Sequence, residues 1–67
     1  MYFIKAKITV SVQGISGKFE RIISWLVNSN TLQEAKYKYE EQIKKDFDHV
    51  DPQNITFEYI EIAGLIP

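Results

Sequence analysis

The sequence predicts an α+β domain with the element order β-β-α-β over its 67 residues. Three observations support this prediction. Apolar and polar residues alternate from Tyr2 to Gln13, which is the period of a half-buried strand. A helix start signal appears at Thr31, and alternation returns between Ile55 and Ile62. We therefore expect a single domain spanning residues 1–67, in which one helix covers one face of a three-stranded sheet.

The first two predicted strands form a hairpin. Gly14 and Gly17 lie between them and supply the positive-φ positions that a short hairpin loop needs. The second strand, residues 18–28, is apolar on both faces. One face carries Phe19, Ile23, Trp25 and Val27, and the other carries Ile22 and Leu26. This alternation places Trp25 in the core, whereas a one-residue bulge would turn it outward.

The predicted helix starts at a capping box, in which Thr31 and Glu34 each satisfy a backbone donor of the other residue. Apolar residues then recur at spacings of three and four, as expected for a helix that packs on a sheet. This stripe consists of Leu32, Ala35, Tyr39, Ile43 and Phe47. Acid–base pairs four residues apart lie on the opposite face and stabilise the helix: Glu34–Lys38, Glu40–Lys44 and Glu41–Lys45.

The third predicted strand follows Pro52, which cannot continue a helix, and ends near Gly64. Its alternation places Ile55, Phe57 and Tyr59 on one face and Thr56, Glu58, Ile60 and Ile62 on the other. A right-handed crossover through the helix brings this strand beside the first strand, antiparallel to it. The expected sheet order is 2-1-3, with the first strand in the centre.

One helix covers only one face of this sheet, so the other face is expected to be uncovered. Its apolar members are Phe3, Ile22, Leu26, Ile60 and Ile62. An exposed apolar patch on a small domain usually marks an interface. We therefore expect a non-enzymatic module that binds a partner protein, and a homodimer is another way to cover the same patch.

Charge is distributed unevenly along a chain whose net charge is −1. Residues 1–45 carry all 8 basic residues, whereas residues 46–67 carry only acidic ones. These acids are Asp46, Asp48, Asp51, Glu58 and Glu61. The acidic C-terminal third is therefore a second candidate surface for a partner protein, the alternative being a solvated turn and edge strand.

Phe3, Lys5 and Lys7 are predicted to share the uncovered face. An aromatic beside basic residues on a sheet is one way in which proteins bind single-stranded nucleic acid. Isolated lysines also serve simply to keep a strand soluble. Single-stranded nucleic-acid binding is thus the alternative function.

Catalytic and metal-binding patterns are missing from the sequence. His49 is the single histidine and there is no cysteine, so neither a zinc site nor a nucleophile–base pair is expected. Asp46, Asp48 and Asp51 lack the glycine and the terminal glutamate of a calcium loop. We expect no enzymatic activity, cofactor or metal. No apolar run approaches the ~20 residues of a membrane span, and we expect a cytoplasmic protein.

The helix start, Thr31-Leu32-Gln33-Glu34-Ala35, carries a resemblance. Together with chain length and the β-β-α-β order, it resembles a family of small phage-encoded inhibitors, to which the podophage inhibitor of bacterial RNA polymerase belongs. The resemblance implies a protein that binds and disables a host enzyme or complex. No partner-contacting residue carries over from it.

Overall fold

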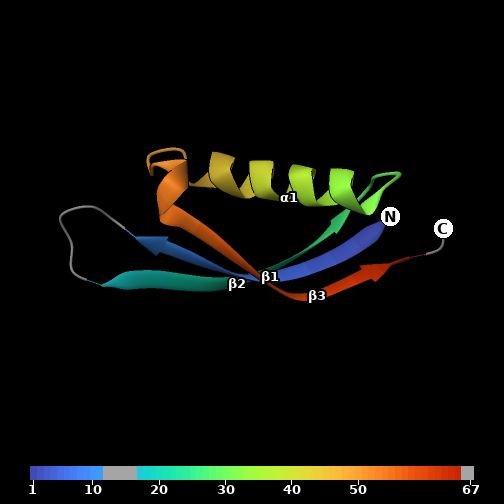
Figure 1. Cartoon of the computed structure of the whole chain (residues 1–67), viewed down its shortest axis with the longest axis horizontal. Coiled ribbons are helices and arrows are strands. Elements are labelled where there is room, and N and C mark those ends of the chain that lie inside the picture. Colours follow the sequence, from blue (N-terminus) through green and yellow to red (C-terminus); the bar gives the residue numbers. More distant parts are fainter. Residues whose placement is uncertain (12–16, 66–67) are drawn as a thin grey trace.

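The computed structural model describes residues 1–11 and 17–65, and it confirms the predicted element order. The elements are β1 (Tyr2–Ser11), β2 (Lys18–Val27), α1 (Leu32–Asp46), a 3-10 turn η1 (Pro52–Asn54) and β3 (Ile55–Gly64). The central strand β1 pairs antiparallel with both neighbours, which gives the predicted order β2-β1-β3 (Figure 1). Gly17 has a φ of 122°, as the hairpin requires, whereas Gly14 lies outside the described residues.

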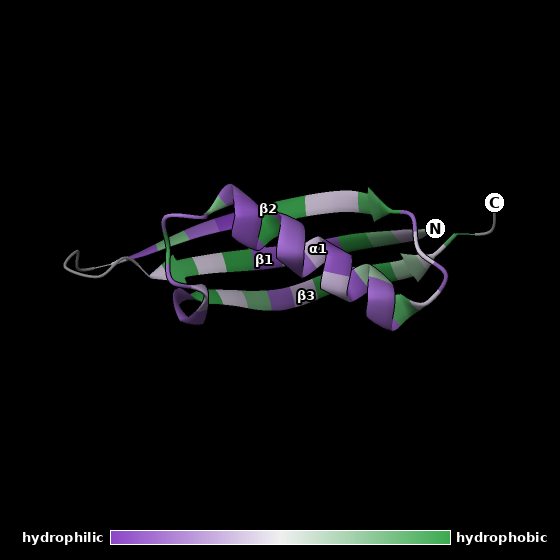
Figure 2. Ribbon diagram, turned by 90° about the horizontal axis from the view of Figure 1, so that it is seen from above, coloured by the Kyte–Doolittle hydropathy of each residue, from purple (hydrophilic) through white to green (hydrophobic). Residues whose placement is uncertain are grey.

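The molecule has two layers and is elongated, with extents of 45 × 18 × 14 Å. The long dimension follows from the strands, each of which has 10 residues. Helix α1 runs obliquely across one face of the sheet (Figure 2). Its first half approaches β3, where Lys36 lies over the ring of Tyr59, and its end approaches β2, where Phe47 meets Phe19.

The core lies between α1 and the sheet. Alternation along β1 turns every second side chain toward the helix, and these are almost fully buried: Ile4, Ala6, Ile8 and Val10. From the helix, Ala35, Tyr39 and Ile43 fill the same layer. Leu32, the first residue of the predicted stripe, is 38% exposed because it lies at the end of the helix, beyond this layer.

The N-terminus of α1 is capped as predicted. Thr31 Oγ1 accepts a 3.2 Å hydrogen bond from the Glu34 N–H. The Glu34 carboxylate forms the expected 3.1 Å ion pair with Lys38. The predicted pairs Glu40–Lys44 and Glu41–Lys45 were wrong. Glu40 instead accepts a hydrogen bond from the Tyr59 hydroxyl, and Lys44 Nζ lies 3.9 Å from Glu41 Oε2.

The end of β3 corrects one predicted face. Tyr59 pairs with Ala6 and Glu61 pairs with Lys5, so Ile60 is an extra residue, a β-bulge, between them. Beyond the bulge the alternation is reversed, and Ile62 lies opposite Ile4 on the helix side of the sheet. The prediction that Ile62 shares a face with Phe3 was therefore wrong.

Candidate interaction surface

The sheet face opposite α1, here called the open face, is formed by alternate residues of all three strands. In the β1–β2 register, Phe3, Lys5, Lys7, Thr9 and Ser11 lie beside Leu26, Ser24, Ile22, Glu20 and Lys18. On the other side, β3 contributes Ala63, Glu61, Glu58 and Thr56. No described residue outside the sheet lies against this face, because the helix and its connections are on the other side (Figure 1).

The open face has an apolar end. Phe3 lies between Leu26 on β2 and Ala63 on β3. Leu26 is 52% exposed and Ile22 is 57% exposed. Three of the predicted patch residues, Phe3, Ile22 and Leu26, therefore share this face as expected. Ile60 is 51% exposed at the bulge. The patch is smaller than predicted because Ile62 lies on the helix side.

Charges on the open face alternate in sign between neighbouring strands. Lys7 Nζ lies 3.2 Å from Glu58 Oε2, and Lys5 lies opposite Glu61. The hydrogen bond from Lys7 to Glu58, together with the negative charges of Glu58 and Glu20, raises the pKa of the Lys7 ammonium above 10.5. Both lysines thus face a carboxylate, which lowers the positive potential available to a phosphate backbone. Nucleic-acid binding stays a prediction, and this arrangement weakens its support.

The five C-terminal acids do not form one surface. Glu58 and Glu61 lie on the open face, opposite the two lysines. The remaining three acids lie around the end of α1 and the following turn: Asp46, Asp48 and Asp51. Each of these has a local partner. Asp46 accepts from Gln42, Asp48 lies 3.7 Å from His49, and Asp51 caps η1 by accepting from the Gln53 N–H. Asp51 thus contributes to local structure whether or not it also contacts a partner.

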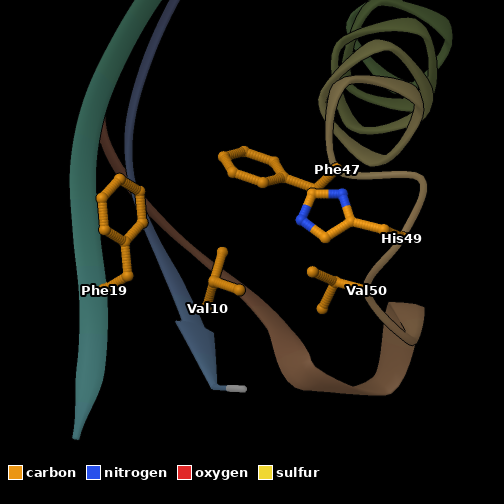
Figure 3. Close-up of a pocket in the computed structure, with 5 residues that line it drawn as sticks. All are labelled: Val10, Phe19, Phe47, His49 and Val50. Atoms are coloured by element: carbon orange, nitrogen blue, oxygen red, sulfur yellow. The ribbon is translucent and has the colours of Figure 1, made fainter.

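His49 lies at the rim of a hollow of about 270 Å³ at the end of α1 (Figure 3). Its other lining residues are apolar: Val10, Phe19, Phe47 and Val50. Nδ1 of His49 lies 3.7 Å from Asp48, and both side chains are largely exposed. Among the described residues that line this hollow, His49 is the polar one, and its neighbour Asp48 lies outside the lining.

A second hollow, of about 320 Å³, lies between β2 and α1. It is lined by Trp25, Tyr37, Lys38, Glu41, Gln42 and Lys45. Trp25 faces the helix side, as predicted, and its ring lies 6.5 Å from that of Tyr39. It is nevertheless 40% exposed, because the oblique helix leaves this part of β2 uncovered. The alternation of apolar residues along β2 correctly predicted that Trp25 faces the helix side. It did not indicate that the side chain would be exposed there.

Within the described ranges 1–11 and 17–65, no set of three or more His, Cys, Asp or Glu residues is arranged to hold a metal ion. The same residues include no helix of the length and apolarity needed to cross a membrane. Comparison of the chain with protein-family models, curated proteins and solved structures found no match.

Proposed function

We propose that this chain is a non-enzymatic protein-interaction module that docks on another protein through the open face of its sheet. The observation that carries the proposal is the exposure of Ile22 and Leu26 beside Phe3, on a face that the helix does not reach. Placing such side chains in water is unfavourable by roughly 25 cal/mol for each Å² of apolar surface, and a docked protein removes that cost.

The chemistry of the open face favours a protein partner over a nucleic acid. Within the described residues, its three lysines, Lys5, Lys7 and Lys18, are matched by three glutamates, Glu20, Glu58 and Glu61. Protein interfaces commonly combine an apolar core with a polar rim. The apolar end of the open face and its alternating charges fit that description. The proposed partner surface is therefore apolar opposite Phe3 and mixed in charge opposite Lys7 and Glu58.

The resemblance to phage-encoded inhibitors adds a class of partner to this proposal. A protein that disables a host enzyme needs only a surface that fits its target and no catalytic group of its own. The support comes from the β-β-α-β order and from the Thr31–Ala35 segment. Under this proposal, a host enzyme or complex docks on the open face.

Differential capture tests the proposal. Wild-type protein and two variants are immobilised and exposed to a lysate of the native host. Leu26→Asp places a charge on the open face, and Tyr37→Asp places one on α1, away from the open face, where Tyr37 is 65% exposed. We expect a protein retained by the wild type and by Tyr37→Asp but lost by Leu26→Asp. Equal capture by both variants contradicts docking through the open face.

A further inference from the structure

The two edges of the sheet differ in how they are protected against pairing with another strand. Edge strands in natural proteins carry bulges, charges or prolines that discourage such pairing. β3 has the bulge at Ile60 and the charged residues Glu58 and Glu61. β2 pairs with β1 along all ten residues without a shift in register. Its second half, Ile22–Val27, contains no charge and no proline.

The unprotected half of β2 is self-complementary. The segment Ile22-Ile23-Ser24-Trp25-Leu26 reads apolar, apolar, polar, apolar, apolar, and is symmetric in polarity about Ser24. If a second copy of this strand is added antiparallel with Ser24 opposite Ser24, Ile23 lies opposite Trp25 and Ile22 lies opposite Leu26. Residues that face each other in a ladder share a face, and both pairs satisfy this condition.

The hollow beside β2 provides space for the added strand. It is lined by Trp25 of the edge strand β2 and by residues of α1 that include Tyr37 and Lys38. In the symmetric register, Ile23 of a second copy lies next to Trp25, on the helix side of the sheet. The oblique path of α1 leaves this part of the edge free (Figure 2). The same space that exposes Trp25 in one copy thus accommodates a side chain of the other.

We propose that β2 pairs with β2 of a second copy of this chain, antiparallel and about a two-fold axis at Ser24. The result is a six-stranded sheet with both helices on the same side. The two open faces then adjoin along Ile22 and Leu26, so dimerisation enlarges the docking surface of the proposed function instead of covering it. The dimer does not depend on that function, because it uses the strand edge rather than the face.

Cysteine cross-linking tests the position of the axis. The chain contains no cysteine, so one introduced thiol reports on a single contact. Opposed Cβ atoms in a ladder lie about 4.5–5.5 Å apart, close to the separation that a disulfide spans. Thr56→Cys is the control, since Thr56 is exposed on the same face but on β3. Under mild oxidation we expect Ser24→Cys to form covalent dimers at least about tenfold faster than Thr56→Cys.

Sedimentation of the cysteine-free protein provides the second measurement. We expect a concentration-dependent species of twice the 7.8 kDa chain mass. Ser24→Lys and Ser24→Glu should each weaken this species, because like charges then oppose each other at the axis, and an equimolar mixture should restore it. A monomer at all concentrations overturns the proposal. A dimer in which Ser24→Cys cross-links no faster than Thr56→Cys also overturns it, and places the contact elsewhere.

Discussion

The Tyr39 hydroxyl donates a 2.7 Å hydrogen bond to the backbone carbonyl of Ile23. This bond joins the centre of α1 to β2 across the core. The Tyr39 side chain is fully buried, and its ring lies within 6.5 Å of the rings of Trp25, Phe57 and Tyr59. A single helical residue therefore contacts the two outer strands, and it holds the helix on one face while the open face stays free.

Removing this hydroxyl should destabilise the domain without changing its packing. We expect Tyr39→Phe to lower the free energy of unfolding by about 1 kcal/mol, the usual net contribution of one hydrogen bond. Tyr37→Phe is the matched control, because Tyr37 is 65% exposed and should change stability little. Urea unfolding followed by circular dichroism measures both variants. Equal midpoints for the two variants would contradict a contribution from the Tyr39 bond.

Stability should fall at alkaline pH because three groups favour their protonated forms in the folded state. Burial raises the pKa of Tyr39 above its ordinary 10.0, and burial followed by the hydrogen bond to Glu40 raises the pKa of Tyr59. The pKa of Lys7 is raised above 10.5 by Glu58. A raised pKa contributes stability that is complete below the unfolded-state pKa and disappears as pH rises toward the folded-state pKa.

The urea midpoint should therefore be steady near neutral pH and decrease once the pH passes 10.0. Absorbance of tyrosinate near 295 nm, recorded on the same samples, should show two tyrosines that ionise late or only on unfolding. Glu40→Gln should lower the pKa of Tyr59 while leaving it above its ordinary value, because burial is its larger cause. A midpoint that does not change up to pH 11 would rule out this linkage.

Because of the bulge at Ile60, a charge should affect stability differently at Ile60 and at Ile62. Ile62 lies opposite the buried Ile4, so Ile62→Asp should cost about 2 kcal/mol or more by placing a charge beside the core. Ile60 is 51% exposed, and Ile60→Asp should change stability by less than about 1 kcal/mol. Chemical denaturation of the two variants compares them directly. The reverse order would indicate that β3 continues without a bulge.

The helix cap offers a local test of how α1 begins. Thr31→Ala removes the oxygen that accepts from the Glu34 N–H and should cost about 1 kcal/mol. Thr31→Ser keeps that oxygen and should retain most of the stability. Thermal unfolding of the two variants distinguishes loss of the cap from loss of the threonine methyl group. Equal destabilisation by both substitutions would assign the effect to the methyl group.

The element order was predictable because each element has a local cause. Alternation marks β1, Thr31 marks the start of α1 and Pro52 precedes β3, all within a few residues of sequence. The face of Ile62 was missed because a bulge is one extra residue in the backbone and strict alternation cannot represent it.

A signal for the bulge was nevertheless present in the charges. Lys5 and Lys7 are two residues apart, whereas Glu58 and Glu61 are three apart. Neighbouring strands can place both glutamates opposite both lysines only if β3 contains one extra residue, and the structure has that arrangement. The spacing of these charges on the two strands therefore predicts the extra residue, and with it the position of Ile62 on the helix side.

The candidate surface was predicted less completely than the fold. Phe3, Ile22 and Leu26 were assigned to the uncovered face by alternation alone, and the register confirms their placement. The exposure of Trp25 depends on the angle at which α1 crosses the sheet, and the helix pattern carries no information about that angle. The acids of the C-terminal third are close in sequence, which predicts one surface, but the fold separates Glu58 and Glu61 from the acids at the end of α1.

Photo-cross-linking in the native host tests the docking proposal most directly. p-Benzoylphenylalanine replaces either Phe3, at the centre of the apolar end of the open face, or Tyr37, on α1 and away from the open face. Both replacements substitute one aromatic side chain for another, and both leave the residues of β2 unchanged. Docking through the open face predicts a covalent product from position 3 with a protein other than a second copy of this chain, and little such product from position 37. A product from position 37 alone, or from neither position, would contradict it.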